Sequence, residues 1–553
     1  MPLIDKIREK KLIELAKTRF DPNLTPAELK VLHDSANSEE LPYPAQNAPR
    51  PVVRPQFIRW LAVDPETAPH IDPEGLRVYG FTIPGDLDLR ECHVNPTLTF
   101  CRSDLQGQIN LRSAETRGLF FFESLLAGDI LADRVIVHGP LFLQGIRSYG
   151  GINLVGAKIE GGLECTGAKL RTRGLALSAD SALIVGHVLL NGGFESEGEI
   201  SLRGAEITGQ LICGGAKLKA ASVALLADGA KIGGGVVLMR GFESEGAILL
   251  AGAEIGGILE VRGVKVATVV CENAVVRGDL VWQRIEKSEN TTLNLIGAKV
   301  NILRDDRMSW PDEGNLRLEG LVYEELILHA PSSDEDIKGH QYSSELTLRA
   351  EDRIAWLELQ PQEAAAAAQP WVQLANFLRA SGDPEGAREV LYTYRRRSRG
   401  QGLLLRGGTY PIDLFEQWPL GISVPILFFG SIGSLIFWRA HRMKMMAPTE
   451  KEAYEEFHKT GKLPERYAPF NAIIYSLENV LPVVKLGQDR DWAPDPQAGK
   501  ASSLPERGKR RALTRRVPRL NYRWLAVSRW LLILLGWALA IILAGAIGGI
   551  FKP

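Results

Sequence analysis

The feature that most constrains this chain is a 26-residue segment that recurs three times at a spacing of 48 residues. The copies occupy residues 145–170, 193–218 and 241–266, and the second reads GFESEGEISLRGAEITGQLICGGAKL. A shifted copy, LNLIGAKV, ends at Val300, and a weaker one, GDLDL, occupies residues 85–89. A fixed period of this kind is typical of repeat proteins, in which each repeat packs mainly against its neighbours.

Each copy has the pattern of short β-strands. Apolar residues alternate with polar ones, as Ile200 and Leu202 do, and an alternation of two residues indicates a strand with one face inward. Glycine, of which the chain has 55, separates these runs at the places where corners need a positive φ or a close backbone approach. A helix would need a period of 3.6 and would lose about 1 kcal/mol for each interior glycine.

The sequence therefore predicts a mainly β fold, a right-handed parallel β-helix (a solenoid) over residues 75–350. A period of 48 residues corresponds to two coils if each coil has roughly 20–30 residues.

Residues 1–74 predict a helical N-terminal cap for the solenoid. Thr25 has the character of an N-cap, Pro26 stands at the first helical position, and Glu28 stands where a capping box places its acid. Residues 57–65, FIRWLAVDP, add a short amphipathic stretch.

Residues 364–399 predict a helical hairpin after the repeats. Two apolar stripes at helical spacing flank Gly382; they comprise Trp371, Leu374, Ala375 and Leu378, then Ala387, Val390, Leu391 and Tyr394. The hairpin resembles a single tetratricopeptide-like unit, and one unit alone indicates a cap or hinge rather than a peptide receptor.

Residues 415–553 predict an α-helical transmembrane module. Residues 421–438 have the length of a bilayer span, and residues 530–551 carry no charge over 22 positions. Between them, residues 469–487 mix apolar side chains with polar ones that are costly against lipid.

The topology of this module raises a conflict. The first twenty residues have no apolar core of signal-peptide length, so we expect the solenoid in the cytoplasm. Nine basic and no acidic residues lie between Arg507 and Arg529, which also favours the cytoplasmic side. Two spans cannot place both the solenoid and the basic segment on the cytoplasmic side. Either residues 469–487 cross the membrane as a third span, which the basic segment slightly favours, or they form an interfacial or re-entrant segment.

The order of several segments resembles a family of bacterial membrane proteins commonly labelled membrane-associated oxidoreductases, which are similar in style to pentapeptide-repeat solenoids. The resemblance rests on IRWLAVDPETAPHIDPEGLRVYGFTIPGDLDL at 58–89, RIAWL at 353–357, QPWVQLANFLRASG, and NAIIYSLENVLPVVKLGQ before the last helix. It implies a redox activity, but it carries no motif that would place a flavin or nicotinamide.

We find no catalytic, cofactor-binding or metal-binding motif in the sequence. No GxGxxG stands between a strand and a helix, and the nine histidines have no metal-ligand spacing. Cys165 and Cys213 are in phase, but Val261 takes that position in the third copy, which favours packing over metal binding. Glu195 and Glu243 begin recurrent acidic pairs, which we interpret as solvated turns rather than a general acid and base.

The basic residues near the membrane module predict contacts with anionic lipid headgroups rather than nucleic acid. The candidates are Arg510, Arg511, Arg515 and Arg516.

These features favour an interaction scaffold: a cytoplasmic solenoid held at the bacterial inner membrane by a multi-pass anchor, with a protein partner or a second copy bound to it. The alternative is an oligomeric channel in which residues 469–487 form a re-entrant pore segment lined by Tyr475, Ser476, Glu478 and Asn479. The oxidoreductase that the resemblance implies is a third possibility.

Overall fold

The computed structural model describes residues 2–20, 24–39, 41–45, 49–329, 345–346, 349–365, 367–400, 423–465, 467–481, 484–498 and 521–547. The chain divides into two compact units, Met1–Gln401 and Gly402–Pro553.

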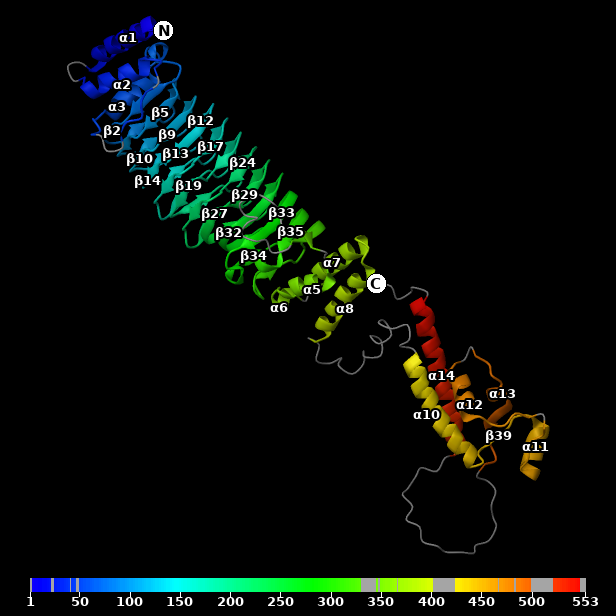
Figure 1. The fold of residues 1–553 in the computed structure, drawn as a ribbon. Helices are drawn as coiled ribbons and strands as arrows, with labels where there is room; N and C mark the ends of the chain where they lie inside the picture. The colour runs from blue at the N-terminus through cyan, green and yellow to red at the C-terminus, as the bar shows by residue number, and fades with distance from the viewer. Residues whose placement is uncertain are drawn as a thin grey trace, which may run out of the picture. The chain divides into compact units, whose positions relative to one another are not determined.

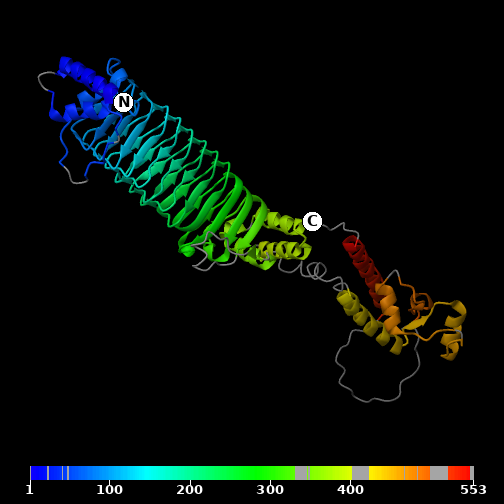
Figure 2. The same ribbon diagram turned by 45° about the horizontal axis from the view of Figure 1, so that its top comes forward.

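The first unit is a parallel β-solenoid of about 11 turns, as predicted, with helices at both ends (Figure 1). Each regular coil contributes four short strands, and each strand pairs with the strand four further along the chain; Figure 2 shows the coils stacked in sequence order. On one side of the coils, two columns of mostly short strands start at β2 (Thr82–Ile83) and β3 (Leu87–Asp88), and the column that starts at β3 ends at β36 (Leu316–Arg317). The right-handed sense of the coil stays a prediction.

One column of strands crosses every coil. Its members are β1 (Leu76–Tyr79), β5 (Leu98–Cys101), β9 (Leu119–Phe122), β13 (Leu141–Gln144), β17 (Leu163–Glu164), β21 (Val188–Leu189), β25 (Leu211–Ile212), β29 (Val236–Met239), β32 (Leu259–Val270), β33 (Val275–Ile285), β35 (Lys299–Asp306) and β37 (Val322–His329).

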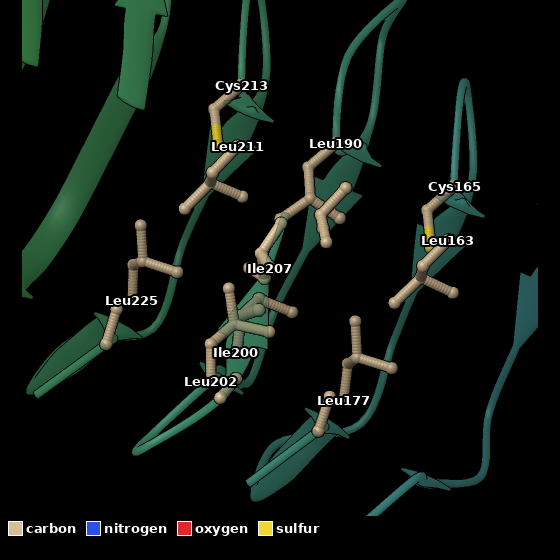
Figure 3. Packing of buried hydrophobic residues seen from close by; sticks show 14 of the residues in the cluster. Leu163, Cys165, Leu177, Leu190, Ile200, Leu202, Ile207, Leu211, Cys213 and Leu225 are labelled. Atoms are coloured by element: carbon tan, nitrogen blue, oxygen red, sulfur yellow. The ribbon is translucent and has the colours of Figure 1, made fainter. Parts of the chain in front are cut away.

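The 48-residue period is two coils, as the sequence predicted. Leu163 pairs with Val188 in the next coil, and Val188 pairs with Leu211 in the one after, so Leu163 and Leu211 are two coils apart. Their side chains point into a continuous apolar core (Figure 3). Hydrophobic burial between stacked coils is the main stabilising term of such a fold.

A second column explains why the repeat unit is two coils rather than one. It is formed by β18 (Lys169–Leu170), β22 (Glu195–Ser196), β26 (Lys217–Leu218) and β30 (Glu243–Leu249), and its inward position alternates between leucine and serine. The hydroxyl of each buried serine has a hydrogen-bond acceptor two residues along the chain: Ser196 donates to the Gly198 carbonyl at 2.7 Å, and Ser244 donates to the Gly246 carbonyl at 2.8 Å. Large and small side chains therefore interleave along the core.

Glycine is required where adjacent coils approach most closely. A Cβ atom on Gly198 would lie 2.2 Å from the Thr172 carbonyl oxygen and 2.3 Å from that of Gly174. Glycine is required at position 198 because the backbone of the adjacent coil leaves no room for a side chain.

The N-terminal end is covered by α1 (Pro2–Phe20), α2 (Pro26–Ala36) and α3 (Pro55–Val63). The predicted capping box at the start of α2 is confirmed: the Glu28 backbone N–H donates to Thr25 Oγ1 at 3.2 Å, and the Thr25 N–H donates to Glu28 Oε2 at 2.9 Å. The edge of the first coil is paired as well, because the Val53 N–H donates to the Thr82 carbonyl at 2.9 Å.

The C-terminal end is covered by α5 (Ala350–Glu358), α6 (Gln362–Ala365), α7 (Ala368–Ala380) and α8 (Pro384–Gly400). Two glutamines one turn apart on α7 bond to the open edge of the last coil. Gln369 accepts from the Gly320 N–H at 2.8 Å and donates to the Leu321 carbonyl at 2.8 Å, and Gln373 donates to the Tyr323 carbonyl at 2.9 Å. Their amides thus satisfy backbone groups that a further strand would otherwise pair.

A buried ion pair joins α5 to the same end. The Arg353 guanidinium donates to both oxygens of Asp305 at 2.7 Å, and both residues are buried. Trp310 Nε1 donates to the same carboxylate at 3.0 Å, and the guanidinium carbon lies 5.2 Å from the Trp356 ring centroid. The bidentate geometry and the third donor from Trp310 offset much of the cost of removing these charges from water, although Arg353 Nε has no hydrogen-bond partner among the described residues.

The second unit comprises α10 (Ser423–Arg442), β39 (Met446–Pro448), α11 (Lys451–Thr460), α12 (Ala472–Val480), α13 (Gln488–Asp491), β40 (Trp492–Pro494) and α14 (Tyr522–Ile547). α10 contacts β39, α14 contacts β40, and β39 pairs antiparallel with β40. The end of α10 and the start of α14 therefore lie at the same end of this unit, and the two helices run in opposite directions.

The expected third crossing at 469–487 does not form. Its helix, α12, has nine residues and is about 14 Å long at 1.5 Å per residue, against a hydrocarbon core of about 30 Å. Asn471 caps its start and Leu481 follows its last turn.

We predict that Arg353→Met destabilises the capped end by about 3–5 kcal/mol, because it leaves a buried aspartate charge unpaired. Urea unfolding of the full-length protein in detergent, followed by tryptophan emission, measures the loss. The control is Arg307→Gln, which removes an exposed 3.3 Å pair with Asp352 and should cost no more than about 1 kcal/mol. Equal effects of the two variants would contradict a special role for the buried pair.

Candidate functional site

The four residues predicted to line a pore segment lie on α12. They are Tyr475, Ser476, Glu478 and Asn479, and all four are buried within the second unit. α12 packs against both α10 and α14. The three helices meet at Gly433, where a Cβ atom would lie 2.8 Å from Leu532 Cδ1 and 3.2 Å from Ser476 Cβ.

Glu478 fixes the segment that follows α12. Its Oε1 accepts from the backbone N–H groups of Leu486 and Gly487, each at 2.8 Å, and its Oε2 accepts from that of Asp489 at 3.0 Å. A carboxylate with three backbone donors is well satisfied. Residues 486–489 are therefore held against α12.

Arg529 ties α14 to the same network. Its Nε donates to Asn479 Oδ1 at 3.3 Å, and a terminal nitrogen donates to the Asp489 carbonyl at 3.1 Å. The guanidinium carbon also lies 5.8 Å from the Tyr475 ring centroid. In the sequence analysis Arg529 counts among the basic residues that flank a span. In the structure its side chain is half-buried and hydrogen-bonded to Asn479 and Asp489.

Two hydroxyls of the site are buried without a hydrogen-bond partner in the described part of the chain, those of Tyr475 and Ser476. The Tyr475 ring packs edge-on against Phe437 of α10, with centroids 4.9 Å apart. Because no base contacts the Ser476 hydroxyl within the described residues, the geometry offers no activated serine nucleophile.

The end of the unit near β39 and β40 is an aromatic cluster around Trp492. This buried side chain donates through Nε1 to the Ala468 carbonyl at 3.1 Å and packs against Phe470, with centroids 5.3 Å apart. Tyr454 donates to Asp495 Oδ1 at 2.9 Å, and His458 lies 3.1 Å from the other oxygen. These contacts pack α11, β39, β40 and residues 467–471 into one cluster.

The acidic pairs of the solenoid are members of a charge ladder. Glu195 lies between Lys169 and Lys217 of the adjacent coils, and Glu243 lies between Lys217 and Lys265. Lys169 Nζ is 3.3 Å from Glu195, and Lys217 Nζ is 3.1 Å from Glu243.

Burial alone would raise the pKa of Glu195, but the lysines hold it below its ordinary value. A general acid needs the opposite shift, which favours the predicted surface role over catalysis.

The in-phase cysteines are packing residues. Figure 3 shows Leu190 in the coil between those of Cys165 and Cys213, so the two thiols are not in adjacent coils. Burial raises the pKa of Cys213 to about 12 and that of Cys165 further. Among the described residues, no group of three or more His, Cys, Asp or Glu side chains is placed to hold a metal ion.

The exposed faces of α10 and α14 are apolar. On α14, Leu534 and Ile541 are 63% and 66% exposed, and on α10 Leu427 and Leu435 are 62% and 66% exposed. Within the described residues, one helix is long and apolar enough to cross a membrane, over Tyr522–Ile541, and 22% of its most apolar 18-residue window is buried. Arg510, Arg511, Arg515 and Arg516 lie outside the described residues.

Comparisons with known proteins gave no match to a family model, a curated protein or a solved structure. The resemblance to the membrane-associated oxidoreductase family therefore stays a prediction from the sequence.

We predict that one thiol per native chain reacts with an aromatic disulfide reagent at pH 8, against all five after denaturation. Cys92 is partly exposed, whereas the other four are buried, and burial raises the pKa of Cys101 to about 11 and that of Cys271 to about 12. Since the thiolate is the nucleophile, the buried thiols stay unreactive. Cys92→Ser should abolish the native reaction; a second fast-reacting thiol in that variant would contradict the packing.

Proposed function

We propose that this protein is a membrane-tethered scaffold, in which α10 and α14 cross a lipid bilayer and hold the β-solenoid as a rigid surface for a protein partner or a second copy. The observation that carries the proposal is the apolar and unburied face of α14, because a surface of this kind is stable only against lipid or another apolar surface. With 26 residues α14 is about 39 Å long, enough for a hydrocarbon core of about 30 Å. Before its basic last turn α10 has 16 residues and is about 24 Å long, a shortfall that local thinning of the bilayer accommodates.

The distribution of aromatic and basic side chains supports this placement. Trp438 near the end of α10 and Trp524 near the start of α14 are exposed at the same end of the unit. Arg442 and Arg523 lie beside them in the sequence, and no charged residue occurs from Trp530 to Ile547. Tryptophan and arginine at this level are typical of a membrane interface.

In this arrangement two antiparallel spans place α11 and the aromatic cluster around Trp492 across the membrane from the solenoid, while α12 packs beside the two spans. We keep the solenoid on the cytoplasmic side of a bacterial inner membrane, as expected from the sequence. The basic stretch 507–520 then lies on the far side, so the tightly packed hairpin outweighs the positive-inside tendency.

We predict that Leu534→Arg weakens membrane insertion, because arginine at the centre of a span costs about 2.5–3.5 kcal/mol on insertion scales. The measurement is the fraction of full-length protein that floats with membranes after carbonate extraction. Thr460→Arg, on the exposed surface of α11, is the matched control and should float like the parent. Full recovery of Leu534→Arg in the membrane fraction would contradict a span at α14.

The sidedness is tested separately, in a Cys92→Ser background. We expect a membrane-impermeant maleimide to label Thr460→Cys in spheroplasts and to spare Ser381→Cys, which lies in the helical cap of the solenoid. Labelling of Ser381→Cys alone would place the solenoid outside the cytoplasm.

A channel is the second candidate, and the half-length helix α12 between two long helices favours it. Oligomers would then line a path near the Ser476 hydroxyl, which has no hydrogen-bond partner among the residues that the structure describes. This candidate predicts ionic current across planar bilayers that changes in Ser476→Leu; no current with insertion verified by flotation would refute it.

An absorbance spectrum of the purified protein tests the redox activity that the family resemblance implies.

A further inference from the structure

A groove of about 440 Å³ opens on the outer side of the second unit, between α10 and α12. Leu427, Leu435 and Trp438 of α10 form one wall, and Ile473 and Leu477 of α12 form the other. Small residues of α10 make its floor, namely Gly430, Ser431 and Ser434.

The floor offers no free hydroxyl donor to an occupant, because both serine protons are used within α10. The Ser431 hydroxyl donates to the Leu427 carbonyl at 2.6 Å, and the Ser434 hydroxyl donates to the Gly430 carbonyl at 2.7 Å. An occupant of this groove is therefore a hydrocarbon rather than a polar ligand.

The length of the groove distinguishes a lipid chain from a second spanning helix. From Leu427 to Trp438 it extends about 16 Å along α10 at 1.5 Å per residue, half of a hydrocarbon core of about 30 Å. That depth corresponds to one leaflet, whereas a helix of another chain would need a surface through both leaflets.

The groove ends at a positive charge. The Arg442 guanidinium carbon lies 4.7 Å from the centroid of Trp438, the last wall residue, and Arg439 and Lys444 are exposed nearby in the sequence. A basic cluster at the interface complements an anionic headgroup.

We propose that this groove binds an acyl chain of an anionic phospholipid, with the phosphate held at Arg442. The inference rests on the proposed membrane insertion. It makes the groove a specific lipid site in one leaflet, distinct from the general lipid contact of α14.

The test uses full-length protein in phosphatidylcholine vesicles that contain a small fraction of phosphatidylglycerol with a photoactivatable acyl chain. After illumination, mass spectrometry of the peptides locates the attached lipid. We expect attachment within 427–438 and 472–477, in excess over the exposed face of α14, and weaker attachment of the matching phosphatidylcholine probe.

Two variants separate the chain from the headgroup. Ser431→Phe fills the groove from an exposed position, and Arg442→Gln removes the charge; each should reduce attachment roughly fivefold, the effect of about 1 kcal/mol. Val527→Phe and Arg523→Gln make the same changes on α14 and should leave attachment unchanged.

Three results would overturn the proposal: attachment spread evenly over α10 and α14, equal attachment of the two probes, or crosslinks between two copies at the groove. Flotation of the same samples is read first. Protein that fails to float with vesicles would refute membrane insertion and the lipid site together, whereas floating protein with unspecific attachment would refute the lipid site alone.

Discussion

The structure of the first unit depends on backbone hydrogen bonds between coils that are about two dozen residues apart and in register. Leu163, Val188 and Leu211 can form one column only because the coils between them keep nearly the same length. Once this register holds, each inward-facing side chain stacks on the inward-facing side chain of the next coil, so apolar side chains are buried along the whole solenoid. Both ends then expose unpaired backbone groups, which explains why each end is closed by helices.

The two ends solve that problem with different chemistry. At the start, an additional backbone segment pairs with the first coil through Val53 and Thr82. At the finish, a backbone strand, β38 (Glu345–Leu346), pairs antiparallel with the end of β37, and Gln369 and Gln373 add side-chain amides, which carry a donor and an acceptor as a peptide group does. The Arg353–Asp305 pair adds a connection with strict geometry, so the C-terminal cap is held in one orientation on the last coil.

Much of this could be predicted where the signal is local or periodic. The strand spacing, the two-coil period and the capping box at Thr25 and Glu28 all follow from residues close together in the sequence. The contacts of Arg353 and Arg529 could not be predicted, because each joins a partner about 50 positions away that only the folded chain brings near. The sequence shows that the α12 segment is unusually polar for a membrane module. It does not show that these polar side chains are buried against α10 and α14, because those helices are distant in the sequence.

The alternation along the Lys169–Glu195–Lys217–Glu243 column also restricts how such a chain can change in length. Within the alternating part of the column, duplicating a single coil would place lysine beside lysine or glutamate beside glutamate on the surface, and leucine beside leucine or serine beside serine in the core. Nearer the N-terminus the column does contain such neighbours, Arg147 beside Lys169 and Leu105 beside Leu126. Duplicating two coils preserves both patterns. This part of the solenoid should therefore lengthen and shorten during evolution in steps of two coils, and the similarity of the three 26-residue copies at a spacing of 48 residues is the trace expected of such steps.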